Sequence, residues 1–207
     1  ALNPTIEYAY GKGVPTASMT GFLTSEYAIS TSVNYALGGY YIGTWLAETI
    51  GGEGNVIVME GIPGASASDS QHAGMLRALG EYPDITVVAE IAHMWTPQIA
   101  QAELQKWLSA NTTEVHGFAV QSSGESGALN ALESSGRPMV PMALGGEIGA
   151  FCYWRNNPDF IDRAVYAWPP GDDAEFAMNV LLKTMKGQGL KMQSILVPPY
   201  EEDVETI

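Results

Sequence analysis

The stretch Gly51-Gly-Glu-Gly-Asn-Val-Ile-Val-Met-Glu-Gly61 has the form of a buried strand between two tight turns. Its apolar residues 56–59 follow one another without alternation, which is typical of a strand covered on both faces. Helical patterns stand on either side of it, at residues 34–50 and at residues 66–80. A strand that lies between two helices predicts a parallel sheet, because parallel strands need a crossover of this kind.

The same alternation of strand and helix continues along the chain. Further strands are expected at residues 85–91, 115–120 and 139–144, and further helices at 97–108, around 129–132 and at 172–186. Repeated units of this length predict an α/β fold of three layers (α/β/α), with helices on both faces of a parallel sheet. Such sheets bind ligands at the carboxyl ends of their strands. The loops to search therefore begin near Gly61, Ala92, Gln121 and Gly145.

Composition limits the classes of function. Of the 207 residues, 46% are hydrophobic and 15% are charged, which is typical of a globular protein. Nine lysines and arginines against 23 aspartates and glutamates give a net charge of −14, so we expect no nucleic-acid partner. No apolar run approaches the roughly 20 residues of a membrane-spanning helix. Cys152 is the single cysteine and leaves no intramolecular disulfide to form.

The post-strand loops offer no convincing catalytic site. The turn Gly124-Glu-Ser-Gly-Ala128 resembles the one that exposes the nucleophile of α/β-hydrolases, but those enzymes need a histidine later in the chain. All three histidines (His72, His93 and His116) precede Ser126. Metal-ligand spacing and a phosphate-binding glycine loop are missing as well. We therefore expect neither an enzyme nor a metal or cofactor site, and a serine hydrolase using Ser126 is the weakest alternative.

The same loops do carry uncharged hydrogen-bonding groups, one carboxylate and aromatic rings. The residues expected to contact a ligand are Gln71, Gln121, Ser122, Glu147, Trp154 and Trp168. Amides, hydroxyls and a carboxylate bind the hydroxyl groups of a ligand, and tryptophan faces pack on the C–H side of a sugar ring. This mixture suits a neutral polyhydroxylated molecule. Trp95 also follows a strand, but it is expected to pack the entry of the next helix.

Several motifs, taken in order, resemble those of the type I periplasmic sugar-binding family, which includes the ribose- and galactose-binding proteins. The motifs are Gly13-Val-Pro15, Asn34 with Gly38-Gly39, Gly61-Ile-Pro-Gly64, Gly127-Ala128 with Ala131-Leu132, Gly145-Gly-Glu147 and Trp168-Pro169. Each motif alone is unspecific, and their order and spacing carry the resemblance. The resemblance adds Asn34 to the expected ligand contacts.

The resemblance implies a periplasmic-binding-protein-like fold of type I, whose two lobes close on a sugar, a polyol or a related small neutral molecule. It also implies a periplasmic location, with any export signal absent from this chain, and delivery of the solute to the permease of an ABC importer. The effector-binding core of a LacI-type transcriptional regulator shares the fold and is the alternative function.

The departures from the family concern the ligand. Gln71 stands where the family often has an arginine, and Trp168 stands where it has a glutamine. Without the arginine the site lacks a charged, planar donor of several hydrogen bonds. We therefore expect a less charged and more aromatic site than one for ribose or glucose.

The resemblance covers only part of a family member and predicts three segments. Residues 1–30 would be a remnant of the first lobe, with a helix at 3–12, a strand near 15–19 and the first crossover. Residues 31–167 would form the second lobe, which holds most of the ligand contacts. Residues 168–207 would cross back and supply a helix and a C-terminal strand. Most of the first lobe is thus expected to be missing from this chain.

Overall fold

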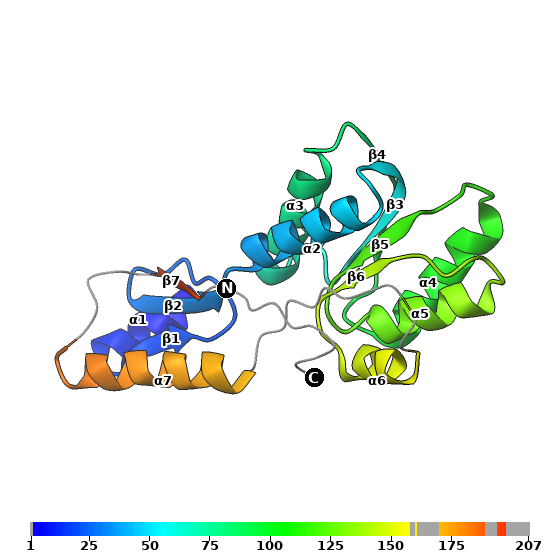
Figure 1. Cartoon of the computed structure of the whole chain (residues 1–207). Coiled ribbons are helices and arrows are strands. Elements are labelled where there is room, and N and C mark those ends of the chain that lie inside the picture. Colours follow the sequence, from blue (N-terminus) through cyan, green and yellow to red (C-terminus); the bar gives the residue numbers. More distant parts are fainter. Residues whose placement is uncertain (1, 158–159, 161–169, 189–193, 198–207) are drawn as a thin grey trace. The chain divides into compact units, whose positions relative to one another are not determined.

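The computed structural model describes residues 2–157, 160, 170–188 and 194–197. The chain divides into two compact units (Figure 1). The first unit combines residues 1–34 with 168–199, and the second combines residues 35–167 with 200–207. The sequence predicts segment boundaries after residues 30 and 167.

The second unit is built on a parallel sheet of four strands in the order β4-β3-β5-β6 (Figure 1). Its strands are β3 (Glu53–Glu60), β4 (Asp84–Ala92), β5 (Gly117–Val120) and β6 (Met142–Leu144). Its helices are α2 (Tyr35–Thr49), α3 (Ser66–Leu79), α4 (Pro97–Ala110), α5 (Glu125–Ser134) and α6 (Ile148–Asn156). Helices cover both faces, which confirms the predicted three-layer α/β/α fold.

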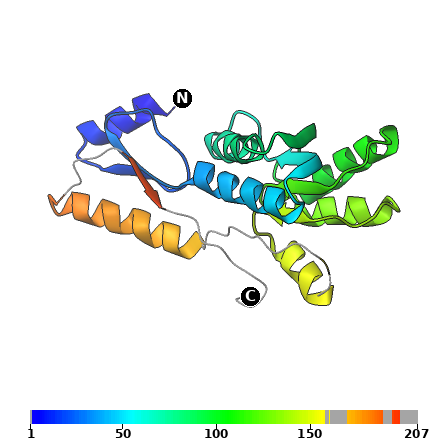
Figure 2. The same ribbon diagram turned by 45° about the horizontal axis from the view of Figure 1, so that its top comes forward.

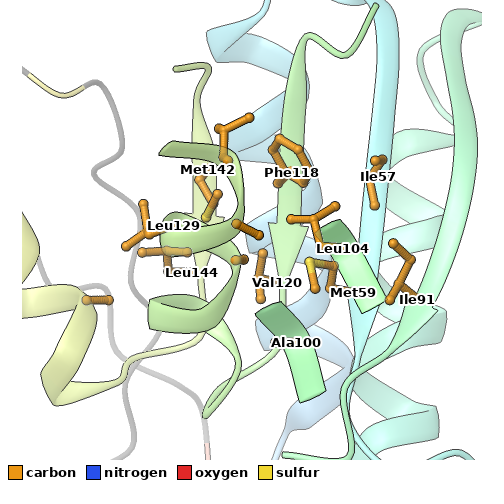
Figure 3. Packing of buried hydrophobic residues seen from close by; sticks show 14 of the residues in the cluster. Ile57, Met59, Ile91, Ala100, Leu104, Phe118, Val120, Leu129, Met142 and Leu144 are labelled. Atoms are coloured by element: carbon orange, nitrogen blue, oxygen red, sulfur yellow. The ribbon is translucent and has the colours of Figure 1, made fainter. Parts of the chain in front are cut away.

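A separate hydrophobic cluster lies on each face of this sheet. On one face, α4 and α5 cover Ile57, Met59 and Phe118 (Figure 3), and α6 adds Ala150 and Trp154 to the same cluster. On the other face, α2 and α3 cover Val56 and Val58. Successive side chains of a strand point to opposite faces, so the four apolar residues of β3 divide equally between the two clusters. This explains why the apolar run in β3 is unbroken.

Helices α2 and α3 approach each other backbone to backbone, and both run beside the sheet (Figure 2). A Cβ atom at Gly39 would lie 1.9 Å from the carbonyl oxygen of Gln71, and one at Gly74 would lie 2.1 Å from that of Ala36. No side chain fits at either position, because interiors are already close-packed. The glycines therefore set the distance between the two helices.

Strand β6 is shorter than the strand expected at residues 139–144. Pro138 and Pro141 lie within or next to that range and supply no backbone N–H for a ladder. Pairing with β5 starts only after the second proline, at Met142 opposite Phe118.

The first unit holds a parallel sheet of three strands in the order β1-β2-β7. Its elements are β1 (Thr16–Ser18), β2 (Ala28–Val33), β7 (Ser194–Val197), α1 (Asn3–Gly11) and α7 (Pro170–Met185). Helix α1 and strand β1 lie within the ranges expected for them. No helix in the described part of the chain is both long enough and apolar enough to cross a membrane.

Strand β2, the central strand of this sheet, is not predicted by its sequence. Its residues Ser30, Thr31 and Ser32 are polar, although all three are buried. Their hydroxyls are engaged locally: Ser30 Oγ accepts from Leu23 N at 2.9 Å, and Thr31 Oγ1 donates to Ser18 O at 2.5 Å. A buried strand whose hydroxyls are satisfied in this way has no apolar pattern from which it could be recognised.

Candidate functional site

The carboxyl ends of β3, β4, β5 and β6 lie at one edge of the second sheet, and Gln121 ties two of the loops that follow them. Gln121 Oε1 accepts hydrogen bonds from Gly61 N at 2.8 Å and from Ser68 Oγ at 3.0 Å. Its Nε2 donates to Ser68 O at 2.8 Å, and the side chain is fully buried. The amide expected to meet a ligand thus binds the loop between β3 and α3.

Glu147, in the loop after β6, reaches the amino end of α5. Its Oε1 accepts from Ser126 Oγ at 2.6 Å, and its Oε2 accepts from Ser126 N at 3.0 Å. The amino end of a helix favours a negative charge. Gly149 leaves room for the carboxylate, because a Cβ there would lie only 3.0 Å from Oε1. By position Glu147 begins α6, but its side chain makes no cap hydrogen bond to that helix. Its carboxylate is therefore fixed on a neighbouring helix.

Glu125, the first residue of α5, is fully buried beside this carboxylate. Its Oε2 accepts from Gly124 N at 2.9 Å, whereas Oε1 has no hydrogen-bond partner among the described residues. Burial raises the pKa of Glu125 well above its ordinary value, and the Glu147 carboxylate raises it further. The sequence singles out Ser126 in this turn and gives no sign that its neighbour is buried.

His93 directly follows β4 and is also fully buried. Its backbone N–H donates to Glu60 O at 2.8 Å, and its ring lies against Gly124, where a Cβ would be 2.6 Å from Nδ1. Neither ring nitrogen makes a well-formed hydrogen bond within the described part of the chain. Burial lowers the pKa of His93 to about 4 despite the opposing effect of Glu147, so the ring is neutral at pH 7.

Trp95 lies over the end of β3 and keeps 37% of its surface exposed. A Cβ at Gly61 would be 2.0 Å from its Nε1, so the indole rests on that backbone. Met94 and Trp95 have φ angles of 56° and 50°, a left-handed conformation that costs free energy for residues other than glycine. Backbone strain of this kind is concentrated at functional sites.

Of the next three predicted contacts, one lies at the same edge and two lie on helices. Ser122 is half-buried at the same edge and donates to Gly146 O at 3.2 Å. Gln71 lies on α3, 4% exposed, with a buried Nε2 that lacks a partner among the described residues. Trp154 is 3% exposed and packs in the hydrophobic cluster beside Phe151.

Two predicted contacts belong elsewhere in the chain. Asn34 lies between β2 and α2 and is half-buried in the first unit. Trp168 lies outside the described residues. The strand-end edge therefore unites Gln121, Ser122 and Glu147 from the prediction with His93, Trp95 and Glu125.

The edge offers hydrogen-bond acceptors and neutral groups rather than cations. In the ranges that the structure describes, no lysine or arginine forms an ion pair with Glu125 or Glu147. Nor do three His, Cys, Asp or Glu side chains gather there as metal ligands would. Such a surface can bind hydroxyl groups and repels anions.

Sequence comparisons relate the chain to known binding proteins. A family model described as "Periplasmic binding protein domain" matches residues 1–189. Over 144 residues the chain is 28% identical to a "Xylitol-binding protein" of Mycolicibacterium smegmatis, a match that covers 69% of this chain and 41% of that protein. The matched region thus spans less than half the length of this curated relative.

Solved structures share the fold. An ABC transporter periplasmic solute binding protein from Actinobacillus succinogenes 130z with bound D-allose has a TM-score of 0.86 and 26% identity; the match covers 100% of this chain and 74% of that one. An ABC transporter solute binding protein from Thermobispora bispora has a TM-score of 0.84 and 23% identity, over 97% of this chain and 61% of that one. At the latter identity the likeness concerns the fold alone.

Proposed function

The chain belongs to the periplasmic binding protein domain family, and on this premise we propose that it binds a sugar or polyol for an ABC importer. The family and the fold are those of solute-binding proteins and not of enzymes. Xylitol and D-allose, named for two relatives, are both small neutral polyhydroxylated molecules. We assign the ligand of this chain to the same chemical class, and the protein to a periplasmic or extracellular location.

The fixed carboxylate of Glu147 is the observation that carries the proposal. Two hydrogen bonds from Ser126 hold it, so it is oriented before a ligand arrives. Each carboxylate oxygen has a further lone pair, and hydrogen bonds from ligand hydroxyls to a charged acceptor are about twice as strong as those to a neutral one. In the adjacent loop Ser122 adds a hydroxyl at the same edge.

Trp95 supplies the apolar part of the proposed site. Its partly exposed indole follows β4 and rests on the backbone of Gly61, which holds the ring in place. A flat ring packs against the C–H face of a sugar or the carbon chain of a polyol. Gln71 is proposed as a further donor because its Nε2 is unused. Asn34, Trp154 and Trp168 stay predictions from the sequence, as does closure of two lobes around the ligand.

Calorimetric titration against a panel of sugars and polyols, with xylitol and D-allose included, tests the proposal. At least one member should bind saturably with one site per chain. Glu147→Gln should weaken that binding about tenfold or more, because a hydrogen bond to a charged group contributes about 1.5–3 kcal/mol. Trp95→Ala should weaken it to a similar extent, because the ligand loses the indole face on which it packs. A panel in which nothing binds would contradict the assignment of the ligand class.

Two matched variants control for general effects. Glu133→Gln removes an exposed carboxylate from the far end of α5, and Tyr41→Ala removes an equally exposed aromatic ring from the middle of α2. Both should bind the solute as the wild type does. If they weaken binding as much as the site variants, the site has been assigned to the wrong edge.

Two alternatives are separated by other assays. A LacI-type regulator core would release or bind operator DNA in response to the solute, whereas an importer component is required for uptake of that solute by cells. For a hydrolase, ester turnover should disappear in Ser126→Ala. The Ser126 hydroxyl already donates to Glu147 and has no histidine partner among the described residues, which favours the structural role.

A further inference from the structure

The buried carboxyl of Glu125 has no part in the function proposed above. One of its oxygens accepts from Gly124 N at 2.9 Å, and the other, Oε1, is shielded from water with no donor among the described residues. An ionised carboxylate at this place would keep a charged oxygen buried without a hydrogen bond, which is unfavourable by several kcal/mol in general. A protonated carboxyl has an O–H to donate and removes the charge.

Glu147 is the nearest acceptor for that O–H: it binds both the N–H and the hydroxyl of Ser126, the residue next to Glu125, and it is among the groups that raise the pKa of Glu125. The two carboxyls differ in their donors. Glu147 receives both the N–H and the O–H of Ser126, whereas Glu125 receives only one backbone N–H, that of Gly124. Two adjacent carboxylates, one fully buried and the other half-buried, cannot both be charged at low cost. The donors place the charge on Glu147 and the proton on Glu125.

The surrounding groups do not offset a second negative charge. His93 packs against Gly124 from the end of β4 and is neutral at pH 7, because burial lowers its pKa to about 4. From the loop after β6 the titratable group facing Glu125 is Glu147 itself. Throughout the described ranges no lysine or arginine pairs with either carboxyl.

We propose that Glu125 is protonated in the folded protein and that its O–H donates a hydrogen bond to Glu147. The two carboxyls then form one acid pair with a single negative charge. Glu125 is thus a positioning residue, which sets the charge and orientation of the carboxylate that meets the solute. Its effect on binding rests on the proposed function. Neutral hydroxylated solutes suit the singly charged pair, and loss of the proton at higher pH would add a second charge and separate the two carboxyls.

The first test needs no ligand and uses the pH dependence of stability. A raised pKa in the folded state means that folding takes up a proton, so stability falls as the pH rises above the ordinary glutamate pKa of about 4.3. Glu125→Gln mimics the protonated form at every pH. The unfolding constant of the wild type should therefore rise relative to that of Glu125→Gln, up to tenfold per pH unit, until the folded-state pKa is reached.

Chemical unfolding between pH 5 and pH 9 measures this ratio. Contributions of His93 are common to the two proteins and cancel. Glu133→Gln, which changes an exposed carboxyl on the same helix, should show the wild-type pH dependence. Parallel curves for the wild type and Glu125→Gln would overturn the proposal.

Infrared spectroscopy gives a readout that a merely structural residue would not change. At pH 7 the wild type and Glu133→Gln should show the carbonyl stretch of a protonated carboxyl group, and Glu125→Gln should lack it. Absence of that band in the wild type would overturn the assignment of the proton.

Titration with xylitol, or with whichever member of the panel binds, tests the link to the solute. The affinity of the wild type should fall as the pH rises from 6 to 9, and that of Glu125→Gln should stay constant. Equal pH dependence in both would overturn the positioning role. If no solute binds, the proposed function fails, while the unfolding and infrared results still decide whether the acid pair exists.

Discussion

At the scale of single residues, Gln121 stabilises the strand-end edge through three buried hydrogen bonds. Its amide is the partner of Gly61 N and of both the hydroxyl and the carbonyl of Ser68. All of these groups are buried. Leaving a buried donor or acceptor without a partner costs about 1–3 kcal/mol for each group. The contribution of Gln121 to stability is therefore large for one uncharged side chain.

Replacement of Gln121 by alanine should lower the free energy of unfolding by about 2–4 kcal/mol, because several buried polar groups lose their partner. Urea unfolding followed by circular dichroism measures the change. Gln98→Ala, at an exposed position of α4, is the matched control and should stay within about 0.5 kcal/mol of the wild type. Equal stability of the two variants would show that the three hydrogen bonds contribute nothing.

His93 should make the protein less stable in acid. Its pKa is about 4 in the folded protein against about 6.5 when unfolded, so unfolding takes up a proton at pH values between the two. Stability from this residue is complete above pH 6.5 and is lost as the pH falls, by about 3 kcal/mol at pH 4. His93→Phe should remove this dependence, which unfolding curves at pH 4 to 7 would reveal. Identical pH profiles of variant and wild type would contradict a buried neutral ring.

The sequence predicts that these residues lie at the ends of strands, but it does not predict which group each of them binds. Gln121 and Glu147 follow strands, and the edge of the sheet at which they meet follows from that alone. Whether each side chain binds the chain itself or is left for a ligand depends on partners far away in sequence. Ser68 lies 53 residues from Gln121, and Ser126 lies 21 residues from Glu147. Glu125 is missed for the same reason, since only its distant neighbours bury it.

At the scale of helices and strands, apolar periodicity predicts the elements whose buried faces are apolar. Strands β3, β4 and β5 and helices α2 to α5 lie at or near their expected ranges for this reason. Strand β2 is missed because its buried residues carry hydroxyls, and β6 is shortened by its prolines. Local sequence indicates which apolar side chains can be buried. Burial of a polar strand depends on hydrogen-bond partners that only the folded chain brings close.

The glycines between α2 and α3 lead to a prediction at this scale. Gly39→Ala and Gly74→Ala should each lower the free energy of unfolding by about 2–3 kcal/mol, since a methyl group would meet backbone oxygens that cannot move aside. This loss exceeds the gain of up to about 1 kcal/mol from better helix propensity.

Thermal or urea unfolding checks the effect of these glycine variants. Gly11→Ala on α1 is the control, because a Cβ there meets nothing within 4 Å. That variant should be neutral or slightly more stable than the wild type. If Gly39→Ala and Gly74→Ala behave like Gly11→Ala, the two helices have room to separate.

At the scale of the whole molecule, the two units differ in the amount of apolar surface that they bury. Both large hydrophobic clusters belong to the second unit. In the described part of the first unit the buried apolar residues are Ile6, Ala28, Val33, Ala177 and Val180. Large side chains such as Tyr8 and Met19 are exposed there. Apolar burial is the main favourable term in folding, so we expect the described part of the first unit to be the less stable one.

Hydrogen exchange should show this difference directly. Backbone amides of β3 and β5 should exchange at least about tenfold more slowly than those of β1 and β2, because local opening is easiest where few apolar contacts hold the backbone. Mass spectrometry of peptides from the four strands at neutral pH provides the measurement. Equal protection of all four strands would mean that the units open together.

The family resemblance is the part of the whole-molecule prediction that proved most informative. Spaced glycines predict it, because they mark close backbone approaches within the fold, such as that of Gly127 to Pro97 O, where a Cβ would lie at 1.9 Å. The glycines do not predict the ligand, because a few side chains that can differ between proteins of one fold determine which ligand binds.

The amide of Gln121 also has a consequence for stereochemistry. Because it joins the loops after β3 and β5 within the folded chain, the entropy of ordering them is lost on folding and not when a solute arrives. Moving these loops to follow an inverted hydroxyl group would break buried hydrogen bonds of Gln121. For the sugar or polyol that we propose as ligand, an epimer would leave a hydrogen bond unmade, so we expect discrimination between epimers through rigidity as well as through the identity of the polar groups.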